Sequence, residues 1–303
     1  MRTKTLFIVN PISGIGKQKR IETLIKKNLD HDLFTYDICY TEHIHHGTEL
    51  ALNAADKGYE CVVAVGGDGS VNDIVQGLRG TSIPMGIIPC GSGNGLAHTL
   101  KIPMLPWLAI RALNQRHEIC IDAIVINDKH VSVNASGVGF DAYVSRLMQG
   151  VKTRGLSGYS NSIIRAYNNY ESATYTLTVN GQSFQRTAWI IGIMNSNRIG
   201  YNFPAAPKAK LDDGLMDIDI IDKVPLDHLP LSVPLALSKH IELSQHVEMF
   251  RASELTIEGN RDRWVDVDGE YMNIGTTLHF VNDTKSVHIF SRNPKQLLLP
   301  PQL

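Results

Sequence analysis

Several features that mark other classes of protein are missing from this 303-residue sequence. No uninterrupted apolar run approaches the roughly 20 residues that a membrane-spanning helix needs. Lys4 interrupts the first residues, and a strand-like run there ends at Asn10 and Pro11, so no signal peptide is expected. The four cysteines form no Cys-x-x-Cys pair, and three of them fall in or just after predicted strands, as small buried residues of a reducing compartment do. We therefore expect a cytoplasmic protein that is soluble or lies on a membrane surface.

An excess of basic charge and two common nucleotide fingerprints are also missing. Lys and Arg number 29 against 30 Asp and Glu, which argues against a nucleic-acid partner. The loop at 10–17 fails the glycine and lysine spacing of a Walker A loop. The glycine turns at 66–69 and 91–93 do not satisfy Gly-x-Gly-x-x-Gly, so a classical dinucleotide site is not predicted.

The stretch at 62–73 carries the strongest local pattern that is present. A β-branched run ends in Gly66-Gly67-Asp68-Gly69, and an apolar pattern at helical spacing follows, which predicts a buried strand, a tight turn and a helix. Glycines let the backbone approach a ligand closely, and the first amides of a helix suit phosphate. Asp68 at the tip would repel a phosphate unless a cation or a proton mediates, so the turn indicates a Mg²⁺-nucleotide site. A plain turn with a capping Asp is the alternative.

Two further predicted strands end in turns of the same kind. The run at 5–9 leads into residues 10–17, and the run at 83–89 leads into residues 90–96. Each turn alone is compatible with an ordinary loop between a strand and a helix. Together, however, they put phosphate-binding turns after three strands, and open α/β sheets bind ligands at the carboxyl ends of their strands. The sequence therefore predicts a nucleotide site.

Near residue 118 the pattern of alternating predicted strands and helices changes to a succession of short predicted strands, which predicts two domains. The first, 1–118, is α/β, with helices near 17–29, 47–57 and 104–115, and residues 291–303 are expected to return to it. The second, 119–290, is rich in short strands, which favours an antiparallel sandwich or distorted barrel. Helical insertions are expected near 141–170 and 226–245. The predicted strands of the second domain are 119–126, 130–136, 174–180, 183–195, 216–221, 254–258, 264–267 and 277–281.

Three polar clusters are weaker signals. His43, His45 and His46 have no acid or thiol at a ligand spacing, so polar surface packing is preferred to a metal site. The acidic residues at 266–270 and at 210–215 each resemble a turn with solvated carboxylates when considered alone.

Taken together, these motifs resemble the diacylglycerol kinase catalytic-domain family, the lipid kinases that also include sphingosine and ceramide kinases. The resemblance covers nearly the whole chain. Residues 10–14, Thr41 with the His46 region, and 91–94 look like its nucleotide motifs, 66–70 like its hallmark with Ser70 in place of the usual Thr, and 268–270 like its acidic catalytic motif. Many bacterial members carry Asp after the Asn of the third motif. This chain has Gly95 there, which leans towards the sphingosine kinases and leaves the acceptor lipid open.

The resemblance implies an α/β nucleotide-binding domain like those of NAD kinases and phosphofructokinases, an antiparallel β-rich sandwich domain for the lipid, and an active site in the cleft between them. It implies ATP and Mg²⁺ as cofactors. The implied catalytic residues are Asp68 and Glu270, and the implied metal loop uses Lys210, Asp213 and Leu215, through a carboxylate and backbone carbonyls that suit Mg²⁺ or Ca²⁺. The residues implied to bind ATP are Asn10, Pro11, Ser13, Gly14, Thr41, Gly66, Gly67, Gly69, Ser70, Asn72, Ser92, Gly93 and Asn94.

The expected reaction is phosphoryl transfer from ATP to a primary hydroxyl of diacylglycerol or a sphingoid-type lipid. Glu270 is preferred as the general base and Asp68 as the residue that holds Mg²⁺, although the reverse assignment stays open. The alternatives are a kinase of a soluble substrate, like an NAD kinase or phosphofructokinase, and a lipid-binding protein without catalysis. The expected partners are the lipid and a membrane surface, contacted through 141–170, and a homodimer is an open alternative.

Overall fold

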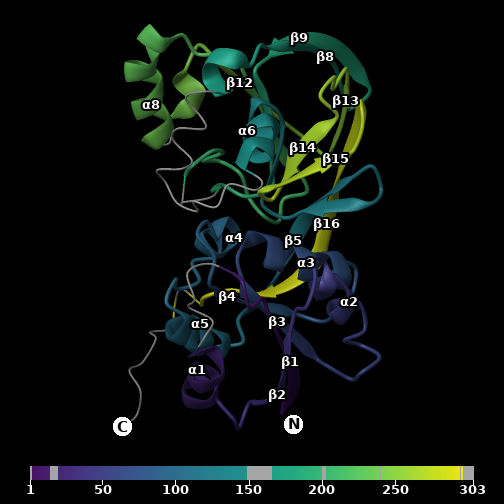
Figure 1. Ribbon diagram of the computed structural model, residues 1–303, viewed down its shortest axis with the longest axis vertical. Helices are drawn as coiled ribbons and strands as arrows, with labels where there is room; N and C mark the ends of the chain where they lie inside the picture. Colours follow the sequence, from purple (N-terminus) through teal and green to yellow (C-terminus); the bar gives the residue numbers. More distant parts are fainter. Residues whose placement is uncertain are drawn as a thin grey trace. The chain divides into compact units, whose positions relative to one another are not determined.

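The computed structural model describes residues 2–13, 20–148, 166–199, 203–238, 240–293 and 295 (Figure 1). It divides the chain into two compact units. The first contains residues 1–123, 200–202 and 284–303, and the second contains residues 124–199 and 203–283. Two strands, β5 (Glu118–Ile126) and β16 (Thr277–Phe290), contribute residues to both units.

The first unit is built on a parallel sheet. Its strands run in the order β2 (Phe34–Tyr40), β1 (Thr3–Val9), β3 (Cys61–Gly66), β4 (Met85–Pro89), and the end of β16 adds to β4. Every residue of β3 and β4 is buried, as the continuous apolar runs predict for strands covered on both faces. The helices are α1 (Ile21–Asn28), α2 (His46–Leu52), α3 (Asp68–Leu78), α4 (Gly95–Thr99) and α5 (Pro106–Leu113).

The register of this sheet aligns the ends of its strands. Val9 pairs with Tyr40 on one side and with Val65 on the other, and Gly66 pairs with Pro89. Because the strands are parallel, the turns that follow β1, β2, β3 and β4 all leave from one edge of the sheet.

The second unit is an antiparallel β sandwich. One sheet has the order β12 (Val247–Ala252), β11 (Met216–Ile221), β10 (Ile190–Met194), β7 (Ala135–Gly139), β14 (Trp264–Val267), β15 (Glu270–Asn273). The other contains β13 (Glu254–Glu258), β8 (Ala173–Val179), β9 (Gln182–Ala188) and β6 (His130–Ser132), with parts of β5 and β16. Inward-facing residues of both sheets, such as Ile218, Val265 and Phe280, form one buried core.

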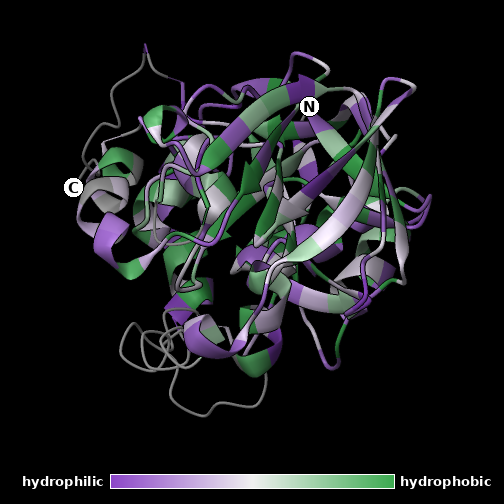
Figure 2. Ribbon diagram, turned by 90° about the horizontal axis from the view of Figure 1, so that it is seen from above, coloured by the Kyte–Doolittle hydropathy of each residue, from purple (hydrophilic) through white to green (hydrophobic). Residues whose placement is uncertain are grey.

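Helical segments are inserted into this sandwich. They are α6 (Phe140–Met148), the 3-10 turn η3 (Leu226–His228), α8 (Leu229–Leu237) and the 3-10 turn η4 (Ile241–Leu243). Hydrophobic residues concentrate on the inner strands, and loops are mostly hydrophilic (Figure 2). No helix in the described part of the chain is both long enough and apolar enough to cross a membrane.

The α/β plus β-sandwich architecture confirms the fold predicted from the sequence, whereas several element bounds were wrong. The run at 130–136 is two strands, β6 and β7, and the run at 183–195 is also two, β9 and β10. β12 was missed because its Glu248 and Arg251 obscure the alternation of a strand that lies at a sheet edge. β16 runs to Phe290 instead of 281, since the polar residues 282–286, with Lys285 at φ 52°, imitate a break.

Candidate functional site

The glycine turns of the first unit touch one another. The amides of Cys90 and Gly91 both donate to the carbonyl of Gly66, at 2.8 and 3.2 Å. A Cβ placed on Gly67 would lie 3.1 Å from the Cα of Gly91, and one placed on Gly91 would lie 2.5 Å from the Cα of Gly67. A side chain at either position would therefore push apart the turns that follow β3 and β4. Close packing, and not only backbone flexibility, explains why glycine occupies both positions.

The turn after β1 joins the same group. The amide of Asn10 donates to the carbonyl of Val65 at 3.0 Å, and its Nδ2 donates to Oγ of Ser70 at 3.3 Å. Its Oδ1 accepts the amide of Ile12 at 3.0 Å, which orders the start of the turn. Ser13 is buried with its Oγ 3.7 Å from a Cβ built on Gly67. Gly14 lies outside the described residues, so its predicted role has no structural counterpart here.

Asp68 is tied to the turn after β4. Its two carboxylate oxygens accept the backbone amides of Asn94 and Gly95, each at 2.7 Å. Asn94 in turn closes its own turn, because its side chain accepts the amide of Gly91 and donates to the carbonyl of Gly91. The two amides orient the carboxylate of Asp68 at the start of α3. Sequence reasoning named Asp68 and Asn94 but not this link.

Other residues that the resemblance implied to bind ATP lie in or next to the turns at the same edge of the first sheet. The amide of Thr41 donates to the carbonyl of Val9 at 2.9 Å, which fixes the turn after β2 beside β1. Asn72 is buried within α3, whereas Ser92 is exposed at the turn after β4. Nδ1 of His45 lies 3.0 Å from Oδ1 of Asp73, so the turn after β2 is also attached to α3.

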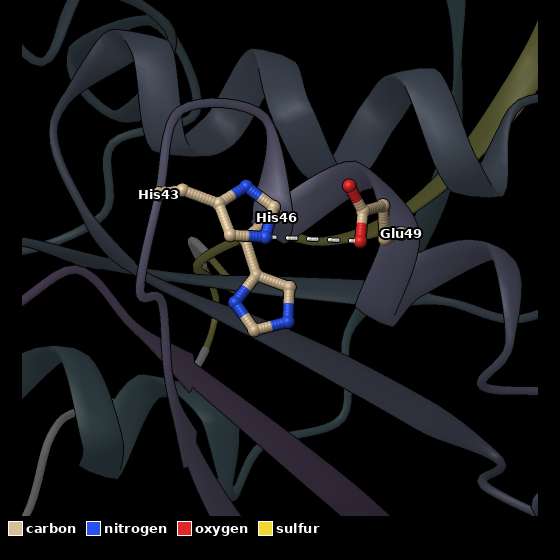
Figure 3. A group of neighbouring side chains, drawn as sticks. All are labelled: His43, His46 and Glu49. Atoms are coloured by element: carbon tan, nitrogen blue, oxygen red, sulfur yellow. Dashed lines mark ion pairs between the residues drawn. The ribbon is translucent and has the colours of Figure 1, made fainter.

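The histidine cluster is joined by an acid, contrary to the prediction that none lies at a ligand spacing. His43, His46 and Glu49 hold ligand-type atoms within 4.8 Å of one another, with Nε2 of His43 3.9 Å from Oε2 of Glu49 (Figure 3). The two imidazole rings stack at 4.6 Å, and Nδ1 of His46 accepts the amide of Glu42. In-plane lone pairs of stacked rings do not converge, so the arrangement matches polar packing better than a preformed metal site.

In the second unit, the acidic motif forms a two-residue hairpin turn between β14 and β15. Asp268 and Gly269 both have positive φ, 51° and 91°, as a type I′ turn requires. Asp268 is not a solvated carboxylate. It is buried and accepts the hydroxyl of Ser132 at 2.7 Å together with three backbone amides, those of residues 133–135, at 3.0 Å. Its side chain therefore fixes the connection between β6 and β7.

Glu270 follows this turn as the first residue of β15 and is exposed. Behind it, Asp266 is buried and accepts the amide of Gly269 at 3.1 Å and the hydroxyl of Ser145. Burial, followed by the nearby charge of Asp141, raises the pKa of Asp266 well above its ordinary value. Burial also raises the pKa of Asp141 to about 6. The turn before Glu270 is therefore bonded to Asp266, which together with Asp141 forms a pair of acids that resist ionisation. Asp141 was not predicted from the sequence.

An arginine contacts the acid of the loop that was predicted to hold a metal. Arg251 donates to Oδ2 of Asp213 at 2.5 Å and to Oδ2 of Asp217 at 3.2 Å. Oδ1 of Asp213 is buried and has no hydrogen-bond partner in the described part of the chain. Lys210 is exposed and Leu215 half-buried. An unsatisfied carboxylate oxygen is the kind of ligand that Mg²⁺ or Ca²⁺ prefers, so Oδ1 of Asp213 fits the predicted cation loop in this one respect.

The segment expected to contact a membrane is described only in part. Residues 149–165, with Lys152 and Arg154, lie outside the described residues. In the part that is described, Phe140 and Val144 of α6 are buried against Tyr170 and Trp189. The ring of Phe140 stacks on Trp189 with centroids 3.8 Å apart. Phe140 and Val144 are therefore core residues, whereas Leu147 on the same helix is 40% exposed.

Comparison with known proteins adds to this geometry. Residues 4–126 match the model of the diacylglycerol kinase catalytic domain, and residues 134–282 match that of the YegS C-terminal NAD kinase beta sandwich-like domain. A diacylglycerol kinase of Staphylococcus saprophyticus is 26% identical over 302 residues, which cover 97% of each chain. One of Staphylococcus aureus is also 26% identical and covers 97% of this chain and 94% of that one. A crystal structure of a diacylglycerol kinase from Bacillus anthracis has the same fold, with a TM-score of 0.77 and 23% identity over 96% of this chain and 97% of that one.

Proposed function

Because the chain belongs to the diacylglycerol kinase catalytic-domain family, we propose that it transfers the γ-phosphoryl group of ATP to a primary hydroxyl of diacylglycerol or of a sphingoid-type lipid. The family is one of lipid kinases, and the kinase family implies ATP as the donor. We propose both acceptors as alternatives, together with the residue roles given below.

One observation carries the proposal: the turns that follow three neighbouring parallel strands, β1, β3 and β4, meet at one edge of the first sheet. Gly66 bonds to the turn at residues 90–91, and Asn10 bonds to Ser70. Phosphoryl transfer is catalysed mostly by positioning and by neutralising charge, and turns that meet through glycines, without side chains between them, let a polyphosphate approach the backbone closely. We assign this edge as the ATP site.

Asp68 is the acid that such a site needs for a cation. Its carboxylate is oriented by the amides of Asn94 and Gly95, so these two bonds hold it in one geometry. Mg²⁺, when bound, would neutralise part of the phosphate charge. The loop at Lys210, Asp213 and Leu215 is proposed as a separate structural cation site, supported by the unsatisfied Oδ1 of Asp213.

Glu270 is proposed as the general base. It is exposed at the start of β15, and the turn that precedes it is anchored by the bonds of Asp266 and Asp268. An anchored turn supplies the positional precision that a base needs to reach a hydroxyl proton at about 3 Å. The reverse assignment, with Asp68 as base and Glu270 assisting the metal, is the alternative that the kinetics below distinguish.

A thin-layer assay with radiolabelled ATP tests the proposal. The protein is incubated with Mg²⁺ and, separately, with diacylglycerol, sphingosine, ceramide, NAD or fructose 6-phosphate. Label in one of the lipids supports the proposal and identifies the acceptor. Label in NAD or the sugar phosphate instead would assign a kinase of a soluble substrate. Tight binding of a lipid without label in any product would assign a non-catalytic lipid-binding protein.

A further inference from the structure

An apolar segment of the second unit exposes several large hydrophobic side chains. It consists of η3, α8 and η4, residues 226–243, and we refer to it as the apolar lobe (Figure 1). Residues 229–238 include no charged side chain. Leu226, Leu237 and Leu243 are 65%, 61% and 68% exposed, which places three of the most exposed large hydrophobic residues in one short segment.

The position of α8 in the fold does not account for its composition. Among the described elements, α8 packs mainly against η3 and η4, its own neighbours in sequence. The sequence of α8 leaves no room for a polar face, because eight of its nine residues are Leu, Val, Ala or Pro and the ninth is Ser232. A helix that is apolar on all sides is normally buried in a protein core or in lipid. The exposed leucines show that a protein core does not supply this burial.

The lobe is attached at its base by polar contacts. Nδ1 of His228 lies 2.8 Å from Nε2 of His246, so the start of the lobe is joined to the segment that follows its end. The ammonium of Lys208 lies 3.2 Å from Glu242, which neutralises the acid next to Leu243, and Lys208 remains 73% exposed. The exposed His240 lies between α8 and η4. Because Lys208 offsets the charge of Glu242, this acid does not oppose the insertion of Leu243 into a bilayer interface.

The size of the lobe favours a bilayer over a protein partner. A helix of nine residues is about 14 Å long and about 10 Å wide, so its exposed face is on the order of 200 Å² against about 800 Å² per partner in a stable protein interface. A bilayer needs no such minimum, because each side chain partitions into it separately. The same length is far below the roughly 30 Å of a hydrocarbon core, which excludes a spanning role.

We propose that the apolar lobe, residues 226–243, inserts its exposed leucines into the interface of a lipid bilayer and is the membrane contact of this protein. The inference deepens the proposed function, which requires access to an acceptor that resides in a bilayer. It assigns the contact to the second helical insertion, where the sequence alone favoured the first.

Sedimentation with sucrose-loaded vesicles of phosphatidylcholine and phosphatidylglycerol tests the inference without ATP. The test variant is Leu237→Gln with Leu243→Gln. The matched control is Leu52→Gln with Leu105→Gln, because these two leucines are 60% and 52% exposed on the first unit. All variants are first compared with the wild type by thermal unfolding, which should be unchanged because the side chains are exposed.

We expect the lobe variant to lose at least about tenfold in vesicle partitioning, since two leucines leave the interface, while the control binds like the wild type. Equal binding of the lobe variant and the wild type, or no binding by the wild type, would overturn the inference. Sedimentation velocity without lipid tests whether a second copy of the chain covers the lobe instead. If the wild type is a dimer that the lobe variant dissociates, and vesicle binding stays intact, the inference is also overturned.

Phosphorylation of short-chain diacylglycerol dissolved in detergent separates this inference from the proposed function. Retained activity of the lobe variant there, with lost vesicle binding, supports both. If the wild type phosphorylates no lipid but binds vesicles through Leu237 and Leu243, the proposed function fails and the membrane contact stands.

Discussion

The backbone amide of Gly95 donates to Oδ1 of Asp68 at 2.7 Å, although 27 residues separate the two in sequence. The amide of Asn94 occupies the other oxygen at the same distance. Gly95 is the position at which the resemblance drawn from the sequence led us to note Gly in place of Asp. In this chain the backbone at that position, rather than a second acid, orients Asp68.

Asp68→Asn is expected to abolish phosphoryl transfer and also to destabilise the first unit. The amide group of Asn would place an N–H opposite a backbone N–H, so one of two charge-assisted bonds is lost, at a cost of about 1–3 kcal/mol. From the sequence alone, a residue at a turn tip suggests no stability cost. Urea unfolding and the kinase assay measure the two effects separately. Asp56→Asn, at an exposed position, is the control, and near-normal activity of Asp68→Asn would remove Asp68 from the mechanism.

Glu270→Gln is expected to lower kcat by about 10²–10⁴-fold while the affinity for ATP changes little, because a positioned base acts on the acceptor hydroxyl. The substitution leaves the hairpin intact, since Asp266 and Asp268 make the anchoring bonds. ATP affinity is measured by equilibrium dialysis, and kcat by the thin-layer assay at saturating lipid. Glu258→Gln, also exposed on a strand of the second unit, is the matched control. A loss in ATP affinity as large as the loss in kcat would assign Glu270 to the metal instead.

The stability of the second unit should depend on pH through Asp219. Burial, followed by the charge of Asp217, raises the pKa of Asp219 from 3.8 to about 8, and its Oδ1 has no hydrogen-bond partner in the described part of the chain. A carboxyl with a raised folded pKa binds its proton more tightly in the folded state. Its contribution to stability is therefore complete below about pH 4 and is lost as the pH rises through about 8.

Asp219→Asn should accordingly match the wild type near pH 4 and become the more stable protein, by an amount on the order of 2–5 kcal/mol, near pH 9. Urea unfolding at several pH values measures the difference, and Asp212→Asn, at an exposed position, should show none. A constant difference between Asp219→Asn and the wild type across this range would mean that Asp219 does not titrate as its burial requires.

The sequence predicts best those parts of the site that depend on local chemistry. Gly66 to Gly69 lie between a buried strand and a helix, as the apolar run before them and the helical spacing after them predicted. That the turns meet also followed, because parallel strands end at one edge. The burial of Asp268 did not follow, since its partners lie 133–136 residues away and leave no local pattern. The same holds for Asp141, whose raised pKa comes from tertiary burial alone.

The last prediction concerns the loop at residues 210–215. Arg251 and a cation compete for Asp213, because the guanidinium binds Oδ2 while Oδ1 stays buried without a hydrogen bond in the described residues. If a cation binds there, EDTA should lower the Tm of the wild type, and Asp213→Ala should abolish that response. Arg251→Gln should enlarge the response, because both oxygens of Asp213 then become available and the local positive charge is lost. Arg186→Gln is the matched control, since Arg186 forms an exposed ion pair with Glu248 outside the loop. Isothermal titration with Mg²⁺ and Ca²⁺ then measures affinity directly. Identical EDTA responses in the wild type, Asp213→Ala and Arg251→Gln would exclude this loop as a cation site and leave Arg251 as the only charge partner that Asp213 requires.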